Sequence, residues 1–336
     1  MQWDRASEDV YIFTSDRYAQ VNAALIRAER IGIVVDTLPY PSETLEMAKI
    51  ARRHCPDGVR FVIYTGPEGD HTYGAFLFPR AEIIAHEDSL HILATEGAAG
   101  LQKAKESDTE FLPVRLRLPT FTFKSGNTIL RLPGKTIEII HVPGHTSSNI
   151  AVLLHEEHTL FAGDAVMPIP TIARGDVEAA KKSLERILSM PLEYIVQGHG
   201  DLILRGEIRE TLKRQIAYLD NLQNKVSKLV ASDAPIEAAE EITVESCGLP
   251  RVLLAGLAPQ LHRANVRALY ERLKRQRDQQ ASSATRRTTA AAKSAAGRTQ
   301  RATNKTSGSK RRAKTQSKTS DKKKQAPTTR SKKRSK

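Results

Sequence analysis

The chain has 336 residues, 40% of them hydrophobic, and a formal net charge of +14. Residues 281–336 hold 19 Lys and Arg against one acid, Asp321, so residues 1–280 carry a net charge of −4. The two cysteines, Cys55 and Cys247, stand in no paired spacing, and no apolar run approaches the roughly 20 residues that cross a bilayer. These features exclude a disulfide scaffold and a membrane-spanning protein. We expect a cytoplasmic protein with a mildly acidic globular body and a basic tail.

The first part of the body alternates strands and helices. Short apolar runs with a turn near residues 29–32 predict β-strands over residues 9–36, and Ser42 is placed to cap the helix that follows. The runs RFVIYT and AEIIAH, residues 60–65 and 81–86, predict two further buried strands. This alternation is typical of a layered α/β domain.

From about residue 120 the pattern changes to successive strands. Apolar runs predict strands within residues 120–123, 127–132, 135–142 and 149–164. A helix capped by Asp176 follows, and a last short strand runs into His199. The body therefore has two related halves, each made of strands followed by a helix.

Beyond His199 the pattern is helical. Apolar residues recur at steps of three and four along one long helix, at Ile208, Leu212, Ile216, Leu219, Leu222, Val226 and Leu229. Another helix, with Val266 and Leu269 on its apolar side, ends near Leu273. These stripes indicate core or dimer contacts. We place the boundaries at residues 1–203 for the α/β domain, 204–278 for the helical segment and 279–336 for the tail.

Residues able to bind a metal follow predicted strands in Gly-bearing loops: Asp70, His71, His145, Asp164 and His199. Isolated histidines fall on helices and surfaces without such order. Two carboxylates and three imidazoles are a suitable ligand set for zinc, iron or manganese. Without a metal, the same groups would form a turn held by hydrogen bonds.

The order of these motifs, GPEGDH, GHT, GD and GHG, resembles that of the metallo-β-lactamase-fold superfamily, in which HxHxDH, a His, an Asp and a final His each follow a strand. The resemblance covers about residues 5–201 and implies a four-layer αββα sandwich that holds two metals. It implies one metal at Asp70, His71 and His199, bridged by Asp164 to another metal that binds His145.

The sequence departs from the family pattern at two positions, both near the metal that would bind His145. Gly66 stands where the first His of the pattern is expected, and Glu68 stands where the second is expected. The metal near His145 keeps as ligands only Glu68, His145 and the shared Asp164, which predicts weaker binding and a harder ion. We expect one or two ions, with zinc first and iron or manganese as alternatives.

The resemblance implies a hydrolase in which a metal-activated water attacks a small-molecule ester, thioester or phosphoester. Asp70 and Glu68 are the candidates to accept the proton of that water. Because 34 residues separate Asp164 from His199, the chain is similar to the compact branch that includes hydroxyacylglutathione hydrolases. The alternative is a non-catalytic or weakly active binding module, which the glycine at position 66 favours.

Two other polar residues leave alternatives open. His86 ends a predicted strand and lies either behind a metal ligand or in the core as a satisfied histidine. Arg174 follows the Asp164 loop and either meets an anionic substrate or lies on the surface.

The basic tail contains no aromatic residue and no Ile, Leu, Val or Met, which predicts disorder. Its composition is similar to that of histone-H1-like segments. Electrostatic binding to DNA or RNA without sequence specificity is one reading, and a solubilising appendage without a fixed partner is the other. The candidate contacts are Lys310, Arg311, Arg312, Lys322, Lys323, Lys324, Lys332, Lys333 and Arg334. The sequence leaves the oligomeric state open.

Overall fold

The computed structural model describes the backbone of residues 1–307 and the side chains of residues 1–283. The chain divides into two compact units, Met1–Arg275 and Gln276–Lys336. The described part of the second unit continues the last helix to Ser307. The nine tail residues predicted to contact nucleic acid, from Lys310 to Arg334, lie outside the described residues.

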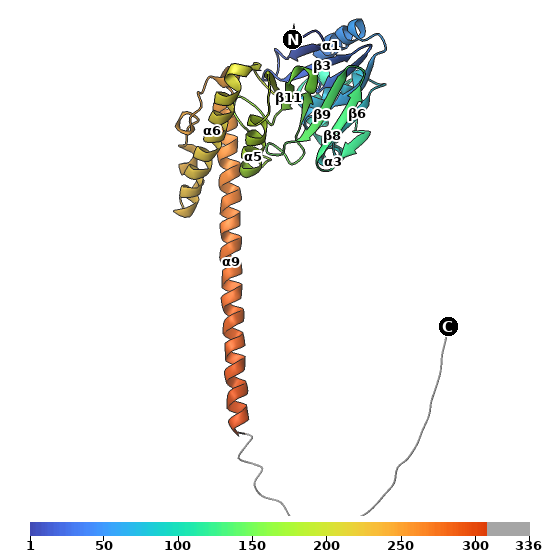
Figure 1. The fold of residues 1–336 in the computed structure, drawn as a ribbon. Helices are drawn as coiled ribbons and strands as arrows, with labels where there is room; N and C mark the ends of the chain where they lie inside the picture. The colour runs from blue at the N-terminus through green and yellow to red at the C-terminus, as the bar shows by residue number, and fades with distance from the viewer. Residues whose placement is uncertain (308–336) are drawn as a thin grey trace, which may run out of the picture. The chain divides into compact units, whose positions relative to one another are not determined.

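The strands of the first unit form two mixed sheets (Figure 1). The first sheet pairs its strands in sequence order: β1 Gln2–Arg5, β2 Val10–Thr14, β3 Asn22–Ala28, β4 Ile31–Val35, β5 Val59–Ile63, β6 Glu82–His86 and β7 Phe121–Phe123. The second sheet has the order β13-β12-β11-β10-β9-β8: β8 Asn127–Leu132, β9 Lys135–His141, β10 Ile150–Leu154, β11 Thr159–Gly163, β12 Tyr194–Gln197 and β13 Ile203–Leu204. Strands β4 to β7 pair parallel, as do β11 and β12, and the other pairs are antiparallel.

The helices stand between the strands and, in the last third of the chain, follow one another. They are α1 Pro41–His54, α2 Gly69–Thr72, α3 Glu87–Ile92, α4 Ala98–Ser107, α5 Val177–Leu188, α6 Arg205–Ala231, α7 Ile236–Glu240, α8 Leu253–Gly256 and α9 Ala258–Ser307. No helix among the described residues has the length and apolar character that a bilayer crossing needs.

An apolar layer from both sheets fills the space between them. Alternate residues of β3 point to its two faces, as the period of two along a strand requires. Ala24 and Ile26 pack with Ile139 of the second sheet, whereas Leu25 packs with Met47 of α1. The first sheet is therefore buried on both faces, which explains its nearly continuous apolar runs.

The outer face of the second sheet is covered by helices. Leu184 of α5, Leu219 of α6 and Val266 of α9 form one buried cluster with Leu160 and Ile195 of the sheet. With α1 on the other side, the layers are helix, sheet, sheet, helix. This confirms the predicted αββα sandwich and the helical segment that follows it.

Two of the predicted helix ends are wrong and one is confirmed. Helix α1 begins at Pro41, whose missing N–H and fixed φ suit the first turn, and the Ser42 hydroxyl instead donates to Glu110. Asp176 caps α5 as predicted, because its side chain accepts from the backbone N–H of Ala179 at 2.9 Å. Helix α9 continues past the end predicted near Leu273, since the apolar stripe stops there but Ala, Arg and Lys favour helix without it.

The carboxyl ends of β4, β5, β11 and β12 meet at one edge of the sandwich. Backbone hydrogen bonds join the two sheets there: Ile150 donates to Thr65 at 2.9 Å, and Asn22 donates to Gly198 at 2.8 Å. Loops that leave these strands are therefore brought together, although they lie far apart in the sequence.

Candidate metal centre

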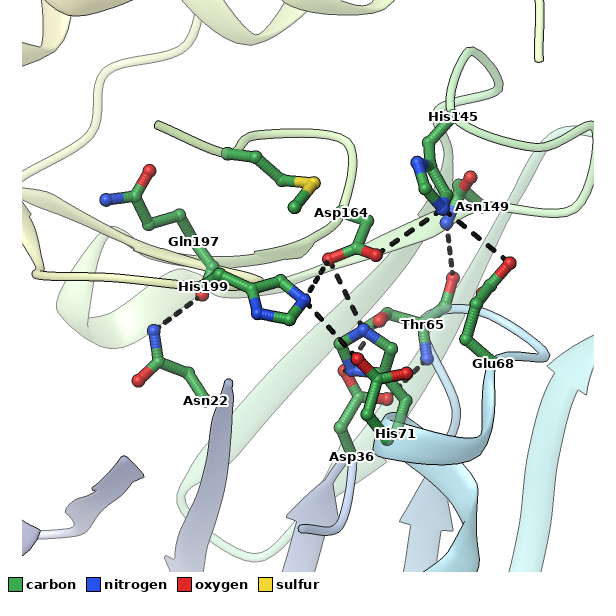
Figure 2. A network of polar contacts seen from close by, with 12 residues as sticks. Asn22, Asp36, Thr65, Glu68, His71, His145, Asn149, Asp164, Gln197 and His199 are labelled. Atoms are coloured by element: carbon green, nitrogen blue, oxygen red, sulfur yellow. Dashed lines mark hydrogen bonds and ion pairs between the residues drawn. The ribbon is translucent and has the colours of Figure 1, made fainter. Parts of the chain in front are cut away.

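The structure places all the predicted ligands at this joined edge. Figure 2 shows His71, His145 and His199 around the carboxylate of Asp164. The Nε2 atoms of His71 and His199 lie 3.3 Å and 3.4 Å from Oδ1 of Asp164, and Nε2 of His145 lies 3.5 Å from Oδ2. The two oxygens of Asp164 thus face different imidazoles.

Two further carboxylates complete two donor sets. Oδ2 of Asp70 lies 3.5 Å from Nε2 of His199, and Oε1 of Glu68 lies 3.6 Å from Nε2 of His145. We call Asp70, His71 and His199 the Asp70 set; their ligand atoms lie within 4.8 Å of one another. Glu68 and His145 form the Glu68 set.

The protein backbone fixes the orientation of two of the imidazoles. Nδ1 of His199 donates to the carbonyl of Ala19 at 2.9 Å, and Nδ1 of His145 donates to the carbonyl of Thr171 at 3.2 Å. In the neutral form of each ring the proton is therefore held on Nδ1, and Nε2, the atom able to bind a metal, faces the centre.

The third imidazole is backed by Asp36, which the sequence prediction missed. Nδ1 of His71 lies 3.1 Å from Oδ2 of Asp36. The backbone N–H and the hydroxyl of Thr65 donate to the same carboxylate at 2.7 Å and 2.6 Å and hold it in place. The sequence does contain a signal for Asp36, because this residue ends the apolar run IGIVVD just as Asp164 ends TLFAGD.

The side chain of Glu68 fills the space beside Gly66. A Cβ on Gly66 would overlap Oε2 of Glu68 and would lie 3.2 Å from Nδ2 of Asn149. The Glu68 side chain therefore occupies the volume that a side chain at position 66 would need. Glu68 can reach the centre through this space because residue 66 has no side chain.

The loop before β3 covers the other side of the Asp70 set. Ala19 and Gln20 have left-handed backbones, with φ of 46° and 51°, which residues bearing a Cβ rarely adopt. This turn aims the carbonyl of Ala19 at His199 and leaves Tyr18 47% exposed at the site. The negative charge of Asp70 raises the pKa of Tyr18 to about 12. Tyr18 therefore stays a neutral phenol, and no pattern in the sequence marks it.

Burial and close packing of opposite charges shift the pKa values of the centre. Burial raises the pKa of Asp70. Burial alone would lower the pKa values of the imidazoles, but Asp164 raises that of His71 well above its ordinary value and that of His145 to about 9. Burial alone would raise the pKa of Asp164, yet the surrounding imidazoles hold it far below its ordinary value. The centre attracts positive charge strongly.

The residues present fit a divalent metal. Buried atoms without a hydrogen-bond partner among the described residues include both oxygens of Glu68, Nε2 of His71 and Oδ1 of Asp164. Two ligands about 2.1 Å from a tetrahedral zinc ion lie about 3.4 Å apart. The separations of 3.3 to 3.6 Å between facing ligand atoms match that value. A cation would also compensate carboxylates that pair, among the described residues, with imidazoles alone.

Two cavities open onto the ligands. One of about 600 Å³, here called the apolar cavity, is lined beside the ligands by Met167, Ala173, Leu254, Leu257, Leu261 and Ala264. Another of about 790 Å³ extends along α4, with Tyr73, Lys103 and Ser107 in its wall. Tyr18, Glu68, Asp70 and Arg174 line both.

The structure decides the open alternatives for His86 and Arg174. His86 is a satisfied core residue: its Nδ1 accepts from the N–H of Asp88 at 3.1 Å and its Nε2 donates to the carbonyl of Lys124 at 2.9 Å. Arg174 is a surface residue: its side chain is 55% exposed and pairs with Glu96 at 2.7 Å, although it also contributes to the lining of both cavities.

Several known proteins are similar in sequence to this chain. A family model described as the metallo-β-lactamase superfamily matches residues 17–199. An atrochrysone carboxyl ACP thioesterase of Claviceps purpurea is 25% identical over 201 residues, 58% of this chain and 56% of that protein. The hydroxyacylglutathione hydrolase GloC of Haemophilus influenzae is 34% identical over 97 residues, 27% of this chain and 45% of that protein. The chain thus spans about half the length of these curated relatives.

Solved structures with the same fold are more distant in sequence. The sec-alkylsulfatase Pisa1 from a Pseudomonas species superposes with a TM-score of 0.65 at 18% identity, covering 80% of this chain and 50% of that one. A metallo-β-lactamase family protein from Thermus thermophilus superposes with a TM-score of 0.59 at 18% identity, covering 81% and 95%. At such identities these likenesses show the fold alone.

Proposed function

Because the chain belongs to the metallo-β-lactamase superfamily, we propose that it is a metal-dependent hydrolase that cleaves an ester, thioester or phosphoester bond of a small molecule. The observation that carries the proposal is the placement of Asp164, whose two oxygens lie 3.3 to 3.5 Å from three different imidazoles. A carboxylate shared between two donor sets suits a pair of neighbouring metal ions.

The two donor sets differ in strength. The Asp70 set, with Oδ1 of Asp164, would supply two carboxylates and two imidazoles, the donor types that zinc takes in proteins. The Glu68 set, with Oδ2 of Asp164, supplies two carboxylates and one imidazole. It would hold an ion more weakly and would accept manganese or iron as well as zinc.

A divalent ion bound at these sets would lower the pKa of water and polarise the carbonyl or phosphoryl oxygen of the substrate. Asp70 and Glu68 line both cavities, so either carboxylate can take a proton from water and return it to the leaving group. Asp36 and the carbonyls of Ala19 and Thr171 keep the imidazoles oriented while the proton moves.

The names of the relatives favour acyl substrates within this proposal. One is named a thioesterase and another a hydrolase of hydroxyacylglutathione. Both matches cover about half of the relative's own length, so the acyl substrate is a proposal for this chain.

The test is metal binding and hydrolysis by the full chain. The wild type, reconstituted with zinc and dialysed, should retain metal by elemental analysis, and His71→Ala and His199→Ala should lose most of it because each removes an imidazole of the Asp70 set. His91→Ala, an exposed histidine on α3, is the matched control and should retain the wild-type metal content. A wild type with no more zinc than His71→Ala, and no activity on a panel of esters, thioesters and phosphodiesters, would refute the proposal.

The second candidate is a non-catalytic binding module whose basic tail attaches it to nucleic acid. The glycine at position 66 favours it, because the Glu68 set has one ligand fewer than the Asp70 set. The same experiment separates the two. A chain that binds DNA in a salt-dependent way but neither retains zinc nor hydrolyses any member of the panel would be such a module.

A further inference from the structure

The wall of the apolar cavity comes from the C-terminal helical segment. Leu254 of α8, Leu257 between α8 and α9, and Leu261 and Ala264 of α9 line this cavity, together with the ligands His145, Asp164 and His199. Leu254 is buried, and Leu257 and Leu261 are half-buried. An apolar surface thus lies directly beside the groups proposed to carry out hydrolysis.

The protein holds this wall in a fixed shape. Leu254 and Ala255 have left-handed backbones, with φ of 52° and 53°, a conformation that packing has to enforce for residues with a Cβ. Asn265 fixes the opposite side, because its Nδ2 donates to the carbonyl of Pro170 and its Oδ1 accepts from the N–H of Ile172, both at 2.8 Å. The cavity is therefore preformed.

The charges around the cavity favour an uncharged occupant. Two arginines reach its lining, and each is already engaged by a carboxylate: Arg17 by Glu110 and Arg174 by Glu96. No lysine is present in the described lining. A cavity of about 600 Å³ with this lining matches the size and character of small-molecule sites that take an apolar group.

We propose that the apolar cavity binds the uncharged acyl group of an ester or thioester substrate. This rests on the proposed hydrolase function and narrows its substrate class. In the reaction a water oxygen bonds to the carbonyl carbon, and the bond from that carbon to oxygen or sulfur breaks. One water proton goes to the leaving oxygen or sulfur, and the other is released with the carboxylate product.

The experiment compares p-nitrophenyl octanoate with p-nitrophenyl acetate, using the zinc-loaded full chain. The wild type should hydrolyse the octanoate with a kcat/KM at least about tenfold higher, because only its longer chain reaches the leucine wall. Leu257→Gln makes the wall polar, and Ala264→Trp fills the cavity from an exposed position. Each should lower kcat/KM for the octanoate at least about tenfold and bring the ratio of the octanoate value to the acetate value close to one.

Leu253→Gln is the matched control. Leu253 is half-buried in the same segment, but it lines a different cavity, beside Pro250 and Arg214. This variant should leave both kcat/KM values unchanged, which separates an effect on the acyl group from general destabilisation of the segment.

A metal-independent measurement accompanies the kinetics. Octanamide, a neutral analogue of the acyl group, should bind the metal-free full chain in calorimetry and should not bind Ala264→Trp. Equal kcat/KM values for the two esters, together with no octanamide binding, would overturn the assignment of the cavity while leaving the hydrolase proposal intact. Failure of the metal-loaded chain to hydrolyse either ester would contradict the hydrolase proposal instead, and octanamide binding would still decide what the cavity takes.

Discussion

At the scale of single residues, three glycines leave space that neighbouring side chains of the candidate centre occupy. A Cβ on Gly198 would overlap Oδ1 of Asp164, and a Cβ on Gly163 would overlap the hydroxyl of Thr65. Gly163 also has a left-handed backbone, with φ of 50°. Gly66 belongs to the same group of positions, but its neighbour is the flexible end of Glu68 and can move aside.

Gly66→Ala should therefore weaken the Glu68 set without unfolding the protein. The new methyl group would push the Glu68 carboxylate away from His145, and the affinity for Mn²⁺ should fall about tenfold or more. Competition titration with Mn²⁺ and elemental analysis measure this change. Gly206→Ala is the control, because a Cβ there meets nothing within 4 Å. An Mn²⁺ affinity equal to that of the wild type would show that Glu68 does not depend on the space at residue 66.

At the scale of whole elements, helices α6 and α9 hold the loop that follows β11. Nε2 of Gln215 in α6 donates to the carbonyl of Met167 at 2.7 Å. In α9, the buried Asn265 bonds the loop at Pro170 and Ile172 and also donates to the hydroxyl of Tyr218 at 3.1 Å. The helical segment thereby positions the stretch that carries Thr171, the partner of His145.

Asn265→Ala should destabilise the protein by about 3 kcal/mol, because it leaves buried N–H and carbonyl groups of the loop without partners. Denaturant unfolding of the full chain, followed by circular dichroism, gives the free energy of unfolding. Arg263→Ala, an exposed position on the same helix, should change it by less than about 0.5 kcal/mol. Equal effects of the two substitutions would mean that the hydrogen bonds to the loop contribute nothing measurable.

The convergence of the candidate ligands could be predicted from the sequence, but the cavity wall could not. Asp70, His145, Asp164 and His199 each follow an apolar run, and the structure brings the ends of those strands to one edge. The apolar stripe of α6 likewise predicted burial of Leu219.

Other features depend on tertiary contacts that have no local signal. The left-handed turn at Leu254 is imposed by packing, and nothing in the sequence near Tyr18 places that loop over Asp70. The shared volume of Gly66 and Glu68 is likewise visible only once the backbone is known.

At the scale of the whole body, the two sheets are joined at both ends. The candidate metal centre lies at one end, and ion pairs lie at the other. Lys135 at the start of β9 lies 2.9 Å from Asp9, which precedes β2, and Arg27 of β3 lies 2.6 Å from the same carboxylate. Burial alone would raise the pKa of Asp9, but its hydrogen bonds to Lys135 and Arg27 and their charges hold it below its ordinary value.

The stability from Asp9 should therefore depend on pH. Because its pKa is lower in the folded state, the contribution is present above the unfolded value of about 4 and is lost as the pH falls through the folded value. Asp9→Asn should lower the free energy of unfolding by about 1 kcal/mol at pH 7, with the difference from wild type shrinking below about pH 4. Urea unfolding across this range checks it, with Asp4→Asn on the exposed strand β1 as control. A difference that does not depend on pH would exclude the ion pairs as its cause.

The helical segment that forms the apolar wall also has a consequence for how such chains diversify. The candidate ligands come from the sandwich, whereas the leucines beside them come from residues 253–265, so exchange of the second stretch alone would change the selectivity proposed for the acyl group. Asn265 limits that freedom, because it also fixes the loop that carries Thr171. A chimaera that receives residues 253–265 from a relative would keep its reactivity only if position 265 remains an asparagine.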